Sequence, residues 1–209
     1  MLLGGAFVEA TREGGVAGLS FSASLALDGT AKLAALAATL FVARRFWSRA
    51  QGSAAPPGPA ALAGALTGLA FLPLMVGVGL LQGWIYSLVD FPVRAQTIVS
   101  EAVSGPVSSF AALAVFAVTV APVSEEVLFR GFLYAGLRTR LGRVASAVAT
   151  AGAFCLIHVV PDAFATTFLL GLVLADLRER TGGLTAPIAA HACYNAFSMA
   201  GIWMARQGG

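Results

Sequence analysis

Long apolar stretches, separated by short polar or basic segments, set the pattern of the whole chain. A helix of about 20 apolar residues crosses the hydrocarbon core of a bilayer, which is about 30 Å thick. The pattern predicts about six such helices, several of them near this length. They are expected over residues 16–42, 60–88, 107–137, 144–160, 163–177 and 184–204.

The first half of the chain contains two of these spans and one amphipathic segment. Asp28 and Lys32 are four residues apart in the first span, so they could pair on one helix. Alternatively, Asp28 could cap a helix that starts near Thr30. Pro73 is expected to kink the second span. Residues 90–105 are amphipathic and predict a short helix in the membrane interface.

Prolines and glycines divide the second half of the chain. Residues 107–137 are too long for one straight span. Proline lacks a backbone N–H and disrupts the helix around it. We therefore expect Pro122 to separate an apolar half from a half that carries glutamates. Pro161 is expected to end the next span, and the glycines at 182–183 to turn the chain before the last one.

The composition favours a membrane protein. Of the 209 residues, 58% are hydrophobic and only 11% are charged, with a mean hydropathy of +0.83. Soluble domains are usually about one quarter charged. The predicted fold class is therefore all-α, a polytopic integral membrane helical bundle of about six transmembrane helices plus one interfacial helix. We expect a single membrane domain over 1–209, with N-terminal helices over 1–104 and core helices over 105–205.

Positive charge is concentrated in alternate loops. Segments 44–49, 138–143 and 178–180 are basic, whereas 89–106 and 161–162 carry no positive excess. Basic loops stay in the cytoplasm, so both termini are predicted to lie outside. The net charge of +3 follows from this topology and gives no reason to expect a nucleic-acid partner. High Ala and Gly content and short loops favour a multi-pass protein of a bacterial inner (cytoplasmic) membrane.

Polar and ionisable residues recur in three of the apolar segments. Each ionisable group there costs several kcal/mol unless it is paired or lines a wet cavity. The residues are Glu125, Glu126 and Arg130, then His158, then His191 and Asn195. Counted from the basic loops at 1.5 Å per helical residue, they fall in one layer about 20 Å deep, with His191 roughly one turn shallower. We therefore expect one polar site, built by three helices within the membrane.

Spacing separates the roles of the two glutamates. Glu126 and Arg130 are four residues apart and can face each other as an ion pair. Glu125 points about 100° away from Glu126 on a helix of 3.6 residues per turn. Glu125 is therefore the better candidate for a general base that activates water. Alternatively, Glu126 and Arg130 could form a buried ion pair whose role is only structural.

The remaining polar residues can complete such a site. His191 and Asn195 are also four residues apart, so both could donate hydrogen bonds to a developing oxyanion. His158 is left to orient or deprotonate the water. Each has a structural alternative: His158 as a hydrogen-bonded core histidine, and Asn195 as a contact between helices.

Three short motifs carry these residues. EEVLFR at 125–130 fits EExxxR, FCLIH at 154–158 fits FxxxH, and HACYN at 191–195 fits HxxxN. In this order, within apolar helices, the set resembles the CAAX protease and bacteriocin-processing family. This family is also called the abortive-infection family, and it includes the eukaryotic type II CAAX prenyl endopeptidases. The resemblance covers roughly residues 105–200, about half the chain.

The resemblance implies a metal-independent glutamic intramembrane endopeptidase without a cofactor. By that resemblance Glu125 is the general base and His158 positions the water. The HxxxN motif would form the oxyanion hole, and the second glutamate and the arginine of EExxxR would support the site. The substrate would be a membrane-anchored protein or peptide within the lipid bilayer. The depth of the polar layer favours substrates reached from outside, such as C-terminal sorting tails or exported peptides.

Other functions compete with this prediction. A zinc-dependent peptidase could use Glu125, His158 and His191 as ligands. A thiol nucleophile at Cys155 or Cys193 would leave the glutamates without a clear task. A non-catalytic immunity or scaffold protein would keep the fold without the chemistry. A transporter would use the buried charges as a proton relay, although the sequence shows no internal repeat of the kind many transporters carry.

Overall fold

The computed structural model of the chain describes residues 54–91, 102–158 and 163–208, together with residues 30 and 37. The described part consists of helices joined by short turns and contains no strand, which confirms the all-α prediction. Nearly all of the predicted first span, and most of the predicted interfacial helix, lie outside the described residues. The predicted single domain stays a prediction.

Helix α4 (Pro57–Leu88) corresponds to the predicted second span. A proline at the first helical position is favoured because the N–H there has no partner within the helix. The helix continues through Pro73. Its buried residues are mostly small or polar, whereas large apolar side chains such as Leu80 and Trp84 are exposed. This distribution suits a helix that faces lipid on one side and packs closely on the other.

A second long helical segment runs without a break through the glutamates. It comprises α6 (Val107–Val115), η1 (Phe116–Val120), α7 (Ala121–Glu126), η2 (Val127–Tyr134) and α8 (Ala135–Arg138). The predicted division at Pro122 is therefore wrong. The two η segments are π-helical, and the Ala121 N–H donates to the carbonyl of Phe116, five residues back. This wider hydrogen-bond register accommodates a proline that cannot donate to the usual α-helical ladder.

Two of the described helices are long and apolar enough to cross a membrane. They are Pro57–Leu88 and the segment Val107–Arg138, each of 32 residues. Helix α9 (Arg143–Leu156) is apolar but shorter. It ends earlier than predicted, because the chain turns at Ile157 and His158. The prediction of about six spans stays a prediction.

Helix α10 (Phe164–Thr181) extends past its predicted end. Arg178 and Arg180 fall in its last turn, where positive charge interacts favourably with the helix dipole. Gly182, with φ of 70°, then terminates the helix in the left-handed region that glycine adopts without strain. The predicted turn at 182–183 is therefore confirmed.

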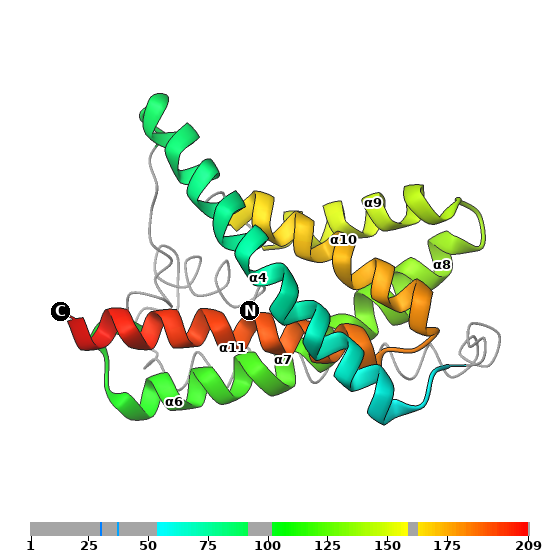
Figure 1. Cartoon of the computed structure of the whole chain (residues 1–209), viewed down its shortest axis with the longest axis horizontal. Helices are drawn as coiled ribbons and strands as arrows, with labels where there is room; N and C mark the ends of the chain where they lie inside the picture. The colour runs from blue at the N-terminus through cyan, green and yellow to red at the C-terminus, as the bar shows by residue number, and fades with distance from the viewer. Residues whose placement is uncertain (1–29, 31–36, 38–53, 92–101, 159–162, 209) are drawn as a thin grey trace.

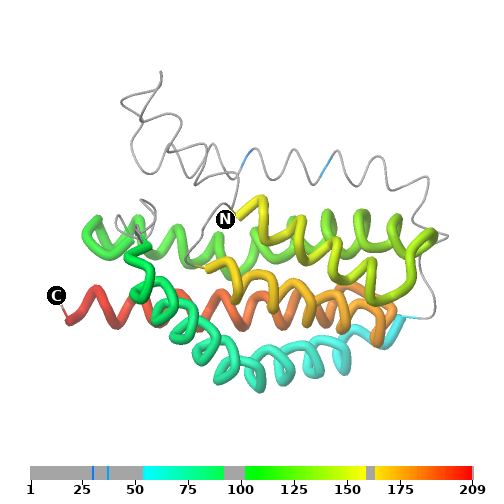
Figure 2. Tube along the Cα trace, turned by 90° about the horizontal axis from the view of Figure 1, so that it is seen from above, coloured from blue at the N-terminus to red at the C-terminus, as the bar shows by residue number. Residues whose placement is uncertain are grey.

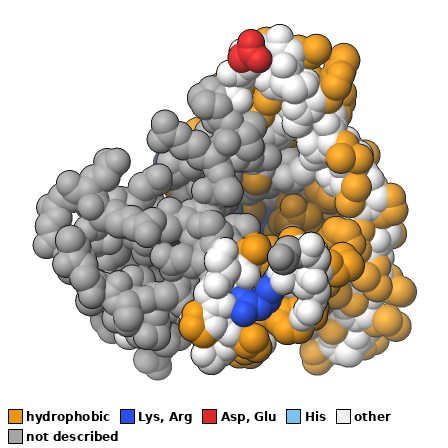
Figure 3. All heavy atoms as spheres, turned by 90° about the vertical axis from the view of Figure 1, so that its left-hand side faces the viewer, with side chains coloured by type: hydrophobic (Ala, Val, Ile, Leu, Met, Phe, Trp, Pro, Cys, Tyr) orange, Lys and Arg blue, Asp and Glu red, His pale blue; other side chains and the backbone are white. Residues whose placement is uncertain are grey.

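Helix α11 (Thr185–Gly208) is central in the described bundle. Figures 1 and 2 show α4 crossing it obliquely, with α6 and α7 along another side and α10 between it and α9. Near its end, Arg206 donates to the carbonyls of Ala102 and Val103, at 3.1 Å each. The face at this end is largely apolar or uncharged, with one small basic and one small acidic patch among the described residues (Figure 3).

The core has two parts that hold α11 in place. The larger cluster joins residues of several helices, among them Phe129, Phe154 and Leu174. The smaller one includes Leu113, Ala117 and Met199 and joins α6 and η1 to the second half of α11. Both halves of α11 therefore pack against other helices, and His191 and Asn195 face the segment that carries the glutamates.

Candidate active site

The two glutamates end α7, the short α-helical segment between η1 and η2. Both are buried, Glu125 at 7% exposure and Glu126 at 0%. π-Helical turns inside longer helices are rare and frequently occur at functional sites, because they change the direction in which side chains project. The glutamates are therefore presented by an irregular part of the helix, a feature that the 3.6-residue period used on the sequence does not include.

Glu126 and Arg130 form the predicted ion pair. Arg130 Nη1 lies 2.8 Å from Glu126 Oε1, and both side chains are fully buried. The second terminal nitrogen of Arg130 donates to the backbone carbonyl of Gly171 at 3.1 Å. A Cβ at Gly171 would lie only 2.8 Å from the Cβ of Ala151, so glycine permits α10 to approach α9 closely. Arg130 thus ties the glutamate segment to the backbone of α10.

His191 lies between the two glutamates. Its Nδ1 is 2.9 Å from Glu126 Oε1, and its Nε2 is 3.8 Å from Glu125 Oε2. A carboxylate paired with a guanidinium only accepts hydrogen bonds, so Nδ1 of His191 carries the hydrogen that Glu126 accepts. Nε2 then lies on the Glu125 side of the ring, 3.8 Å from Oε2, which is beyond hydrogen-bond distance. His191 can donate from Nε2 to an oxyanion only as an imidazolium.

Phe154 connects the polar groups through its ring. The ring is completely buried. The Arg130 guanidinium lies 4.5 Å from its centroid, and the rings of His158 and His191 lie 4.4 Å and 5.8 Å from it. The prediction from the sequence gave the Phe154 ring no role in the site and missed this link. Its position at the head of the FxxxH motif, four residues before His158, was the signal that could have indicated it.

His158 lies just past the end of α9 and is half-buried. Its Nδ1 is 2.5 Å from the carbonyl oxygen of Phe154. Because a carbonyl only accepts, Nδ1 carries the hydrogen, and Nε2 of the neutral ring is an acceptor. An acceptor at this place suits a residue that orients or deprotonates water. The structure connects His158 to the cluster through the Phe154 ring.

Asn195 lies one turn beyond His191 on α11. Its Nδ2 donates to the carbonyl of Ala117 in η1 at 2.7 Å. This bond uses one of the two hydrogens of the amide nitrogen and fixes the orientation of the side chain. Asn195 therefore combines the contact between helices that the sequence offered as an alternative with a second N–H available in principle to a substrate.

The cysteines take other positions. The thiol of Cys155 donates to the carbonyl of Phe164, with a sulfur–oxygen distance of 3.2 Å, and so joins the end of α9 to the start of α10. Cys193 lies on the side of α11 that packs against α4 near Gly68. Both are free thiols. Among the described residues, no three His, Cys, Asp or Glu side chains are grouped as a metal site.

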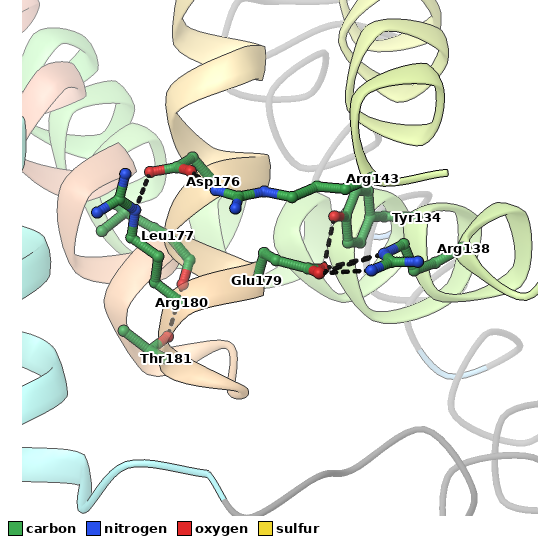
Figure 4. Close-up of polar contacts among 8 residues, drawn as sticks. All are labelled: Tyr134, Arg138, Arg143, Asp176, Leu177, Glu179, Arg180 and Thr181. Atoms are coloured by element: carbon green, nitrogen blue, oxygen red, sulfur yellow. Dashed lines mark hydrogen bonds and ion pairs between the residues drawn. The ribbon is translucent and has the colours of Figure 1, made fainter. Parts of the chain in front are cut away.

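A second polar network lies at the basic end of the bundle (Figure 4). Glu179 accepts from the Tyr134 hydroxyl at 2.7 Å and from Nη2 of Arg138 at 2.8 Å. Asp176 pairs with Arg143 at the start of α9 and with another arginine of α10. Glu179 lies beyond the predicted fifth span, and its hydrogen bond with Arg138 lowers the pKa of its carboxyl. This network fixes the ends of three helices at a distance from the candidate active site.

Together, the helical fold, the long apolar helices and the buried carboxylate–imidazole cluster define an integral membrane protein with an internal polar site. Comparison with protein families then shows a likeness: residues 107–197, a little under half of the chain, match the family model described as type II CAAX prenyl endopeptidase Rce1-like. The match confirms the resemblance that the three motifs predicted, and it includes every predicted site residue. Because that family is one of endopeptidases, the match indicates a protease. Searches of curated proteins and of solved structures found no match.

Proposed function

We propose that this protein is a glutamic intramembrane endopeptidase that hydrolyses a peptide bond of a membrane-tethered protein or peptide. The observation that carries the proposal is the position of His191 between Glu125 and Glu126, with Glu126 held by Arg130. A buried ion pair with a structural task needs only one carboxylate. The second, across the imidazole ring, gives the site a proton acceptor beside a group that can carry a proton.

In the proposed reaction Glu125 takes a proton from a water molecule as the water oxygen attacks the carbonyl carbon of the substrate. His158 helps to orient the water through Nε2. The negative charge that develops on the carbonyl oxygen is stabilised by His191, in its imidazolium form, and by the second N–H of Asn195. The carbon–nitrogen bond then breaks, and Glu125 returns the proton to the leaving amine. The products are a carboxylic acid and an amine.

The support for this division of roles is the difference between the carboxylates. Glu126 interacts with both Arg130 and His191, at 2.8 Å and 2.9 Å. A carboxylate held by two charge-assisted contacts is suited to orientation. The contact between Glu125 and Nε2 of His191, at 3.8 Å, is longer than either of these and leaves room between the two groups for water or substrate. Arg130 and Glu126 therefore position the imidazole, and Glu125 performs the chemistry.

The proposed class of substrate is based on the sequence. The polar layer lies beyond the membrane midplane when it is counted from the basic loops, which favours substrates reached from outside the cell. We propose a multi-pass protein of a bacterial inner membrane that removes C-terminal sorting tails or processes exported peptides. Such a substrate would be held by its own membrane anchor near the scissile bond.

Comparison of cells carrying the wild-type protein with cells carrying Glu125→Gln tests the proposal. Mass spectrometry reads the N- and C-terminal peptides of all membrane and surface proteins. We expect a defined set that retains tails or leaders only in the Glu125→Gln cells. Glu179→Gln is the matched control, because it neutralises a carboxylate outside the cluster and should leave processing intact. Identical terminal peptides in wild-type and Glu125→Gln cells would contradict proteolysis and favour an immunity or scaffold role.

A purified assay separates the glutamic mechanism from the zinc-dependent alternative. The wild-type protein in detergent is incubated with a substrate from that set, with and without a strong chelator. We expect the same cleavage rate in both, because Glu125 activates the water directly. A loss of activity with chelator that added Zn²⁺ restores would replace the glutamic mechanism with a metal-dependent one.

A further inference from the structure

Helix α4 lies against the turn of α11 that carries His191, although α4 lies outside the segment that matches the family. Gly68 forms the contact and is buried. A Cβ at this position would lie 2.9 Å from the carbonyl oxygen of Ala190 and 3.1 Å from its Cα. It would also lie 3.2 Å from the Cβ of Cys193. The two backbones therefore approach one another on both sides of His191 in the sequence.

One turn earlier the same two helices are even closer. A Cβ at Gly64 would overlap the backbone carbonyl of Ala186. The added Cβ would clash with backbone atoms of α11. A change of side-chain rotamer cannot relieve such a clash. A methyl group on this face of α4 would therefore displace the turn of α11 itself.

His191 has little room for such a displacement. Its side chain is 3% exposed, and its Nδ1 is held 2.9 Å from Glu126. Hydrogen bonds of this length weaken steeply when the atoms separate or the angle changes. Glu126 is in turn fixed to Arg130 at 2.8 Å. The Glu126 side chain is thus held in place by Arg130. The position of α11 therefore decides whether the His191 imidazole lies close to both carboxylates.

We propose that Gly68 is a positioning residue for His191: the absence of a side chain there sets the distance of the imidazole from Glu125 and Glu126. The consequence for catalysis rests on the proposed endopeptidase function, but the positioning itself does not. The proposal extends the site to α4, in the half of the chain where the sequence offered no motif.

Other glycines of the same helix supply matched controls. Added Cβ atoms at Gly77 and Gly83 would meet nothing within 4 Å. Alanine at either position raises helix propensity by the same amount as alanine at Gly68. The three substitutions therefore differ only in the contact with α11. Any effect that appears for Gly68→Ala alone is an effect of that contact.

The chain has two histidines, which makes a spectroscopic test direct. The full-length protein with ¹⁵N-labelled histidine, in phosphatidylethanolamine/phosphatidylglycerol nanodiscs, gives imidazole signals from His158 and His191 only. A His158→Gln sample assigns them. We expect Gly68→Ala to shift the His191 signals more than those of His158, and Gly77→Ala and Gly83→Ala to leave both unchanged.

The effect of Gly68→Ala on kcat is measured with a substrate identified by the comparison of terminal peptides. Misplacement of a catalytic group by about 1 Å can lower the rate about 100-fold. We therefore expect kcat of Gly68→Ala to fall by about this factor, with the control variants within about twofold of wild type. Absence of cleavage by the wild-type protein would contradict the proposed function, while the spectra would still test the positioning.

A Gly68→Ala protein whose His191 signals match those of the wild type would overturn the positioning of His191 by Gly68. A shifted spectrum with unchanged kcat would overturn the consequence for catalysis. Gly68→Ala is also made in a Gly77→Ala/Gly83→Ala background, whose added helix propensity offsets some loss of stability. A failure to fold in both backgrounds would assign Gly68 a role in folding alone.

Discussion

Glu126 and His191 are 65 positions apart in the chain, yet Oε1 of the glutamate lies 2.9 Å from Nδ1 of the histidine. This contact joins the long segment that carries the glutamates to the central helix α11. It also fixes the tautomer of His191, so that Nε2 faces Glu125 at 3.8 Å.

Neutralising the two glutamates should have different effects on stability. Glu126→Gln leaves Arg130 buried without its counter-charge, and breaking a buried ion pair costs about 3–5 kcal/mol. Glu125→Gln keeps the Glu126–Arg130 pair intact and should therefore lower the free energy of unfolding by less than Glu126→Gln does. Both variants should lose proteolysis. Thermal unfolding of the purified proteins in detergent measures the difference, and equal destabilisation by the two substitutions would contradict the assigned roles.

Phe154→Leu should lower activity more than stability. Leucine fills much of the same space but has no ring for the Arg130 guanidinium, a contact worth about 2 kcal/mol where water is excluded. The loss also removes the surface against which His158 and His191 are packed. We expect a fall in kcat of at least about tenfold, measured with the purified enzyme. Phe132→Leu is the control, because Phe132 is an exposed phenylalanine of the same helical segment; a similar loss there would argue against the specific role of Phe154.

Gly171→Ala should disturb the site through the helix backbone. The new methyl would lie 2.8 Å from the Cβ of Ala151, so α9 and α10 must separate. Overpacking of this kind costs about 1–3 kcal/mol. The Gly171 carbonyl that accepts from Arg130 would move as well. Reduced thermal stability and reduced cleavage are expected, and Gly152→Ala, which meets nothing within 4 Å, should show neither.

The Glu179 network should make stability depend on pH at the basic end of the bundle. The hydrogen bond with Arg138 lowers the pKa of the Glu179 carboxyl in the folded protein. Its contribution is therefore present above the pKa of the unfolded chain and is lost as the pH falls through the lowered folded value. The wild type should exceed Glu179→Gln in Tm at neutral pH, and the difference should shrink in acid. A difference that stays constant with pH would exclude this ion pair as its source.

The sequence alone could not place every element correctly. The expected division at Pro122 was wrong because the rule that proline disrupts a helix assumes α-helical hydrogen bonds throughout. The structure instead has π-helical turns before and after α7, and the helix passes through the proline. The end of α10 was also placed too early, because the arginines that signal a loop are equally favourable in the last turn of a helix.

By itself, the sequence determined that the chain is helical, where the turn at Gly182 falls, and which polar residues could share one site. These properties depend on composition, on neighbours in sequence and on spacing along one helix. Only the tertiary structure decided that His191 meets both glutamates, that Phe154 contacts Arg130 and both histidines, and that the Gly171 carbonyl binds Arg130. Those contacts join different helices. Their geometry depends on how closely the backbones approach, and that is set by packing across the whole bundle.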